Sequence, residues 1–189
     1  MELGKTLYVT DRAGWRTWLA KNHDREKAIW LVYCRKSSNK PRITYDDAVR
    51  EALCFGWIDS TVKNIDGERF AQRFSRRHAK SSLSQANRER VCQLVRQKKM
   101  TPAGLKAIAA VFDPSDDRPA RFRMPPDILR PLKASNAARA NFQKMPAACG
   151  RVRIAFIDSR RRHGREMFRR SLEHFIGMTA KNKKFGMLI

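Results

Sequence analysis

The residues best suited to chemistry form a group of cations, hydroxyls and one amide: Arg73, Arg76, Arg77, Lys80, Ser81, Ser84 and Asn87. Their order predicts a strand that delivers arginines to the start of a helix. Free backbone N–H groups and the positive end of the helix dipole favour an anion there. Arginine forks add bidentate contacts to phosphate or carboxylate. We treat the group as a candidate anion site. The alternative is that the serines only cap the helix and the arginines pair with Asp59 and Glu68.

A second candidate group comprises Cys54, Trp57 and Asp59. A general-base role for Asp59 beside His78 or Cys54 is chemically reasonable. However, a carboxylate that faces arginines across a hairpin is more often an ion pair, and Asp59 has Arg73 and Arg76 as neighbours on the next strand. Cys54 follows an apolar helix face, which favours a buried, inert thiol. We therefore assign no catalytic residue and leave enzymatic activity open.

The third group is basic and lies near the end of the chain. Residues 151–170 hold eight arginines against two acidic residues. At about 100° per residue, Arg162, Arg165 and Arg169 would share one face of a helix, with apolar residues opposite. Such a stripe is typical of proteins that bind a phosphate backbone or an anionic surface, although a solvated helix face is the alternative. The candidate residues for polyanion binding are Arg161, Arg162, Arg165, Arg169 and Arg170.

Charge dominates the composition. The 189 residues include 41 Lys plus Arg and 18 Asp plus Glu, a formal net charge of +23. Residues 1–120 hold 24 basic and 14 acidic residues, whereas residues 121–189 hold 17 basic and 4 acidic ones. A hydrophobic content of 42% excludes a disordered chain.

The four cysteines and four histidines lack the spacing of a disulfide framework or a metal site, and we expect no cofactor. Without a signal-peptide pattern or a membrane-length apolar run, we expect a cytoplasmic protein with no transmembrane segment.

Hydrophobic periodicity predicts the elements that position these groups. Alternating residues at 57–63 and 68–76, joined through Asp66-Gly67, predict a β-hairpin. Short strands are expected at 7–9 and 29–34. Between them, and after the second, we expect helices, one of which begins at Thr44 and stops at Gly56.

The rest of the chain reads as helical. We expect an α+β fold: a small, mainly antiparallel sheet with packed helices in residues 1–112, a linker at 113–126, and a basic helical segment at 127–189 that packs back on the first part.

One segment is similar to a known family. The octapeptide Ala52-Leu53-Cys54-Phe55-Gly56-Trp57-Ile58-Asp59 resembles the YdeI/OmpD-associated family, also called the bacteriocin-protection family. The likeness continues at residues 72–74 and 100–105, whereas Arg76 and Leu83 depart from the family pattern. The resemblance implies a bacterial cytosolic protein linked to envelope stress or bacteriocin tolerance. It implies no reaction, cofactor or catalytic residue.

Charge and resemblance together predict a stress-associated protein that binds a polyanion through its basic helical face. Nucleic acid is the first expected partner and an anionic membrane surface the second. The alternative is a small-molecule binding protein or enzyme whose pocket is lined by Trp57, Asp59, Arg73, Arg77 and Ser81.

Overall fold

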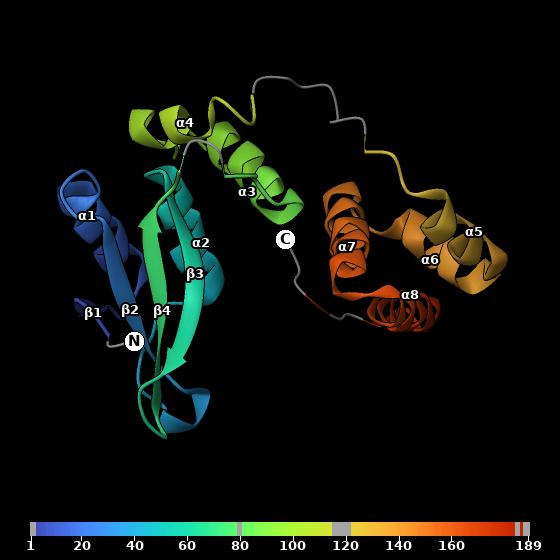
Figure 1. Ribbon diagram of the computed structural model, residues 1–189, viewed down its shortest axis with the longest axis horizontal. Helices are drawn as coiled ribbons and strands as arrows, with labels where there is room; N and C mark the ends of the chain where they lie inside the picture. The colour runs from blue at the N-terminus through green and yellow to red at the C-terminus, as the bar shows by residue number, and fades with distance from the viewer. Residues whose placement is uncertain (1–2, 79–80, 115–121, 184–185, 187–189) are drawn as a thin grey trace. The chain divides into compact units, whose positions relative to one another are not determined.

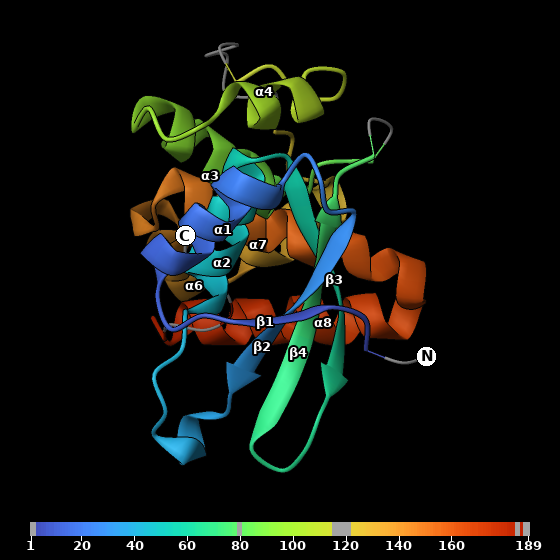
Figure 2. The same cartoon turned by 90° about the vertical axis from the view of Figure 1, so that its left-hand side faces the viewer.

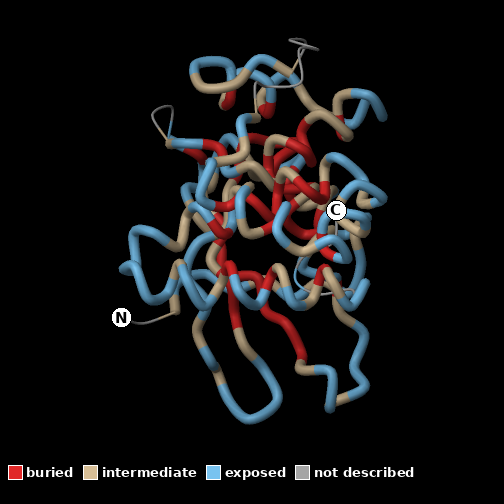
Figure 3. The backbone as a smooth tube through the Cα atoms, turned by 90° about the vertical axis from the view of Figure 1, so that its right-hand side faces the viewer, coloured by how far each residue is buried: buried red, intermediate tan, exposed pale blue. Residues whose placement is uncertain are grey.

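The Asp-Gly turn forms the predicted hairpin. Strands β3 (Trp57–Asn64) and β4 (Arg69–Arg76) pair antiparallel. The Asp66 carboxylate accepts hydrogen bonds from the backbone N–H groups of Glu68 and Arg69, at 2.9 and 2.8 Å, and so holds the turn. Most residues of the turn itself are exposed (Figure 3).

A computed structural model describes residues 3–78, 81–114, 122–183 and 186 (Figure 1). The chain divides into two units, Met1–Pro114 and Ser115–Ile189. The other elements of the first unit are β1 (Thr6–Tyr8), α1 (Arg12–Asn22), β2 (Ala28–Cys34), the 3₁₀ turn η1 (Lys36–Ser38), α2 (Tyr45–Cys54), α3 (Gln85–Arg96) and α4 (Pro102–Ile108). The second unit contains α5 (Pro126–Ala134), α6 (Asn136–Lys144), α7 (Ala147–Ser159), the 3₁₀ turn η2 (Arg160–His163) and α8 (Arg165–Ala180).

The strands lie in the order β1-β2-β4-β3 (Figure 2). Only β1 and β2 run parallel, so the sheet is mainly antiparallel and the α+β prediction is confirmed. Side chains of β2 alternate between the two faces. Ile29, Leu31 and Tyr33 join the large core beneath the helices, whereas Trp30 and Val32 form a small apolar cluster on the other face.

Helix α2 has the predicted ends. The Thr44 hydroxyl accepts a hydrogen bond from the backbone N–H of Asp47 at 3.1 Å. Cys54 is the last helical residue, and Gly56 follows with φ of +74°, a left-handed conformation that ends the helix.

Helix α4 approaches the end of α2 unusually closely. A Cβ atom added at Gly104 would lie 2.2 Å from the Cys54 carbonyl oxygen. Thr101 completes the contact, because its hydroxyl and its backbone N–H both donate to that same carbonyl, at 2.6 and 3.1 Å. Thr101 is also the N-cap of α4, so the start of this helix is held against the end of α2.

We predict that Gly104→Ala lowers the free energy of unfolding by about 2–3 kcal/mol, because the added methyl group would overlap backbone atoms of α2. Chemical denaturation measures the change. Gly67→Ala is the matched control, since a Cβ at Gly67 would meet no atom within 4 Å. Its effect should stay within about 0.5 kcal/mol. Equal losses in the two variants would contradict the close approach.

The second unit has its own core. Ile128 and Leu132 of α5 pack with Ile154 and Ile157 of α7 and with Phe175 of α8. Helix α5 begins at Pro126, the last residue of the predicted linker. Residues 115–121 of this linker lie outside the described residues. Packing of this segment on the first unit stays a prediction. No helix in the described part of the chain is both long and apolar enough to span a membrane.

The predicted single face of Arg162, Arg165 and Arg169 is wrong. Gly164 adopts φ of +102° and separates η2 from α8. Arg162 therefore lies in the 3₁₀ turn, while Arg165 begins the helix, and the 100° spacing does not run through all three residues.

Candidate functional site

The residues of the predicted anion site do not converge. Strand register pairs Arg73 with Trp30 and Arg76 with Trp57. Trp30 belongs to the cluster on the outer face and Trp57 to the core beneath the helices. Paired residues share a face, so Arg73 and Arg76 lie on opposite sides of the sheet. Lys80 lies outside the described residues.

Arg77 is buried beside the serine segment. Its Nη2 donates to the backbone carbonyls of Ser81 and Ser82, at 2.8 and 2.6 Å. Its Nε and Nη1 are buried without a partner, and burial lowers the pKa of this guanidinium. Arg77 thus serves the serine segment through Nη2 and is not displayed on the surface.

Ser84 and Asn87 have structural roles. The Ser84 hydroxyl accepts a hydrogen bond from the backbone N–H of Asn87 at 3.3 Å and caps α3. The Asn87 side chain accepts a hydrogen bond from Arg90 at 2.8 Å. For these two residues the structure matches the alternative in which polar side chains serve the helix itself.

Cys54 and Trp57 belong to the core. Cys54 is fully buried, and burial, then the charge of Glu51, raises the pKa of its thiol. This thiol is therefore poorly suited to act as a nucleophile. The Trp57 indole N–H donates to the backbone carbonyl of His23 at 3.2 Å, and its ring packs edge-on against Trp18.

Asp59 is bound by neutral donors rather than by an arginine. Its Oδ2 accepts hydrogen bonds from the Tyr45 hydroxyl and from the Gln72 side-chain amide, both at 2.9 Å. The predicted pocket of Trp57, Asp59, Arg73, Arg77 and Ser81 does not form, because Arg73 faces the other side of the sheet and Trp57 and Arg77 are enclosed. The predicted pairing of Asp59 with Arg73 or Arg76 is likewise wrong.

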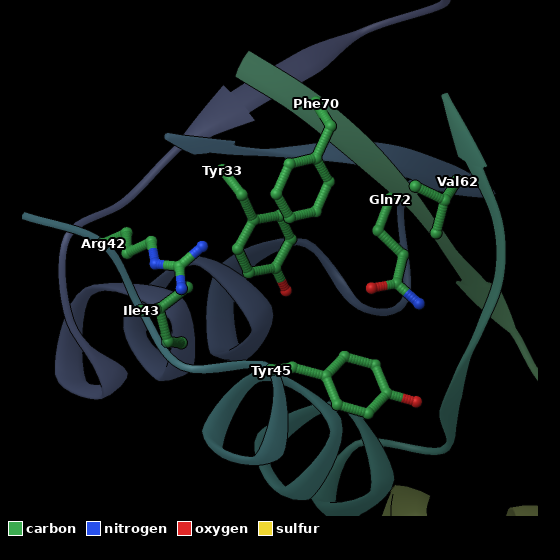
Figure 4. Close-up of a pocket in the computed structure, with 7 residues that line it drawn as sticks. All are labelled: Tyr33, Arg42, Ile43, Tyr45, Val62, Phe70 and Gln72. Atoms are coloured by element: carbon green, nitrogen blue, oxygen red, sulfur yellow. The ribbon is translucent and has the colours of Figure 1, made fainter. Parts of the chain in front are cut away.

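Tyr45 and Gln72 instead line a different pocket, of about 450 Å³, between the sheet and the start of α2 (Figure 4). Its floor consists of two rows of paired strand residues on one face: Tyr33 beside Phe70, and Gln72 beside Val62. Its roof is the segment that leads into α2. The full lining is Tyr33, Arg42, Ile43, Tyr45, Val62, Phe70 and Gln72.

A β-bulge in β3 places Val62 of the pocket on the same face of the sheet as Asp59. Asp59 pairs with Phe74 and Val62 pairs with Gln72, so three steps along β3 match two steps along β4. In a regular strand, residues three apart point to opposite faces. The extra residue lets Asp59 and Val62 share the pocket face.

Two polar groups in the pocket are incompletely partnered. Tyr33 is only 2% exposed, and its hydroxyl makes no hydrogen bond. Burial, then the nearby Tyr45 and Asp59, raises the pKa of this hydroxyl, so it stays protonated. Arg42 is half-buried and donates through Nη1 to the Cys34 carbonyl at 3.0 Å, but no described carboxylate pairs with its guanidinium.

Sequence reasoning missed Tyr33, Arg42, Tyr45 and Gln72. Tyr33 sits in an apolar strand and Gln72 in an alternating one, so both look like ordinary sheet residues. Arg42 and Tyr45 flank the predicted start of a helix, where polar residues are common. The only available signal was the alternation of the hairpin, which places Phe70 and Gln72 on one face.

We predict that Tyr33→Phe raises the free energy of unfolding by about 1 kcal/mol, because it removes a buried hydroxyl that has no partner. Tyr45→Phe is the matched control. It removes a hydroxyl that donates to Asp59 and should lower the free energy of unfolding by about 1 kcal/mol. Urea denaturation of both variants measures the two signs. A loss of stability in Tyr33→Phe would show that the hydroxyl is satisfied.

In the C-terminal unit, three of the candidate arginines are engaged in ion pairs. Arg161 contacts Asp127 and Asp158 at 2.8 and 2.7 Å. Arg169 contacts Glu166 and Glu173, and Arg170 contacts Glu166, at 2.7–2.8 Å. Hydrogen bonds from Arg169 and Arg170 lower the pKa of Glu166 to about 2, so this carboxylate stays ionised at neutral and mildly acidic pH.

Several exposed cations of this unit have no carboxylate partner among the described residues. Arg162 and Arg165 are exposed, and Arg162 makes only a hydrogen bond to the neighbouring ring of His163. Further exposed cations for which no described carboxylate is a partner are Arg123, Arg130, Lys133, Arg139, Lys144, Lys181 and Lys183.

The first unit is thus an α+β sheet domain with a ligand-sized pocket between the sheet and α2. The chain belongs to the family described as a domain of unknown function (DUF8412), whose sequence model matches residues 7–107. The pocket lies within this match, and α5 to α8 lie outside it. No curated protein and no solved structure matches the chain. The family match does not test the resemblance to the YdeI/OmpD-associated family, which stays a prediction.

The described residues contain no group of three or more His, Cys, Asp or Glu side chains placed to hold a metal ion.

Proposed function

We propose that the protein binds a polyanion, nucleic acid in the first place, through its C-terminal unit. One observation carries this proposal. Every described carboxylate of the unit is engaged by Arg161, Arg169 or Arg170, and exposed lysines and arginines are left over on α5, α6 and the two ends of α8. Such an excess cannot be neutralised within this described part of the chain, and it attracts phosphate groups.

The positions of these cations favour an extended partner. Arg165 begins α8, and Arg162 lies in the 3₁₀ turn just before it. Lys181 and Lys183 follow its end, where the Asn141 side chain of α6 donates to the carbonyls of Thr179 and Ala180. A helix of 16 residues is about 24 Å long. A partner that contacts the cations at both ends of α8 must span this length, which corresponds to about seven base pairs of duplex. A single phosphate group can contact the cations at one end only.

An exposed aromatic ring favours nucleic acid over other polyanions. Phe156 of α7 is 54% exposed, and the Arg160 guanidinium lies 4.5 Å from its ring centre. An aromatic ring beside cations can stack on an unpaired base, and single-strand binding proteins combine these features.

We predict that the affinity for a fluorescent single-stranded oligonucleotide falls linearly with salt on logarithmic axes. The double variant Arg162→Gln/Arg165→Gln should reduce the slope by about 1.4, at about 0.7 per lost phosphate contact. Fluorescence anisotropy at several salt concentrations measures both slopes. Arg169→Gln is the control, since this arginine already has two carboxylate partners and its loss should change the slope less. Absence of binding at low salt, or tighter binding to anionic vesicles than to DNA and RNA, would overturn the nucleic-acid proposal.

We also predict that Glu166→Gln raises the affinity for the same oligonucleotide several-fold. The change removes the carboxylate that holds both Arg169 and Arg170, and so frees two guanidinium groups for phosphate. The same anisotropy titration at fixed salt gives the result. Asp59→Asn, which removes one negative charge from the first unit, controls for net charge alone. An equal gain in both variants would argue against a local site on α8.

We further propose a cytoplasmic location and a role in tolerance of envelope stress or bacteriocins. Support for these points comes from the resemblance of residues 52–59 to the YdeI/OmpD-associated family. Survival of a deletion strain under bacteriocin challenge, with and without the complementing gene, tests the role.

A further inference from the structure

We propose that the pocket beneath α2 binds a small aromatic carboxylate with a hydrogen-bond donor at the far end of its ring. This site lies in the first unit and does not depend on the polyanion proposal. A volume of about 450 Å³ is within the range of small-molecule sites.

The anionic end of the ligand is specified by Arg42 and Tyr33. The Arg42 guanidinium uses one N–H on the Cys34 carbonyl and pairs with none of the described carboxylates. The Tyr33 hydroxyl has no partner and points into the space between Tyr45 and Gln72 (Figure 4). A carboxylate accepts hydrogen bonds from both groups, and a guanidinium binds it in a bidentate fashion. A ligand carboxylate would satisfy the buried hydroxyl and neutralise the cation together.

The ring of the ligand is specified by the apolar walls. Tyr33 and Phe70 stack with ring centres 5.1 Å apart and planes inclined by 5°, and together they form the aromatic side of the pocket. Ile43 and the ring of Tyr45 form the facing wall. Val62 is 54% exposed and Tyr45 is 40% exposed, so these two side chains flank the opening through which a ligand enters. A planar ring fits between such surfaces better than a branched chain.

The donor at the far end is specified by Gln72 and Asp59. The Gln72 amide N–H donates to Asp59, which leaves the amide oxygen as a free acceptor in the pocket. The Asp59 carboxylate lies next to this amide and also accepts a hydrogen bond from the Tyr45 hydroxyl. Both groups repel a second anion and accept a hydroxyl or amine hydrogen. The pocket is thus cationic at Arg42 and accepts hydrogen bonds at Gln72.

Three probes test the proposal on the full-length protein. These are 4-hydroxybenzoate, benzoate, which lacks the donor, and 4-hydroxybenzamide, which lacks the charge. Calorimetric titration should rank 4-hydroxybenzoate first, with the benzamide at least about tenfold weaker, because it loses charge-assisted hydrogen bonds. Amide resonances of residues 33, 42–45 and 70–72 should shift in nitrogen-resolved NMR spectra. Equal affinity for the benzamide, or no binding of either carboxylate at millimolar concentration, would overturn the proposal.

Variants separate this pocket from the general attraction of a basic protein for anions. Arg42→Gln should weaken 4-hydroxybenzoate about tenfold or more and leave 4-hydroxybenzamide unchanged. Tyr33→Phe should weaken the carboxylate several-fold. Arg25→Gln is the matched control, because Arg25 is exposed, belongs to the same unit and has no described carboxylate partner. An equal loss of affinity in Arg25→Gln and Arg42→Gln would mean that only the net charge attracts the ligand, and the proposal would fail.

Discussion

The N-terminal unit depends on the ion pairs that hold α2 against its neighbours. Glu51 of α2 is 1% exposed, and its carboxylate is bound by Arg12 and Arg16 of α1, at 2.5 and 2.6 Å. Nearer the start of the helix, Asp46 binds Arg90 of α3. A buried carboxylate without partners would be strongly destabilising. The helix can therefore be buried only where arginines from both sides reach it, and this requirement fixes how α1, α2 and α3 pack.

The pocket follows from this placement of α2. Core side chains from Ala48 to Cys54 fill the space beneath most of the helix. At its first turn the ion pairs of Asp47 with Arg12 and of Asp46 with Arg90 hold the helix to α1 and α3, and Tyr45 reaches the sheet by its hydrogen bond to Asp59. The space between Tyr45 and the Tyr33–Phe70 floor is not filled by a side chain. The bulge in β3 also contributes, because it lets Val62 of the pocket lining share a face with Asp59.

Local signals in the sequence predicted the local structure. The Asp66-Gly67 turn, the Thr44 cap and the stop at Gly56 each depend on residues within four positions of one another, and all three are confirmed. The site depends on partners far apart in the chain. Asp59 meets Tyr45 from another element, and the bulge at residues 59–62 contains no glycine that would mark it. Alternation predicted that Asp59 would face the arginines of β4, but the neutral donors of Tyr45 and Gln72 lie closer.

The net charge of +23 has different consequences in the two units. In the first, acids of α2 are matched to arginines in the interior, and the pocket leaves one guanidinium, that of Arg42, without a carboxylate. In the second, the acids lie on exposed helix faces and many cations remain. One ion pair in a pocket releases at most one counterion, whereas a polymer bound along α8 releases one for nearly every phosphate contact. Salt therefore weakens the second kind of binding far more steeply, so the two activities can be measured separately in the intact protein.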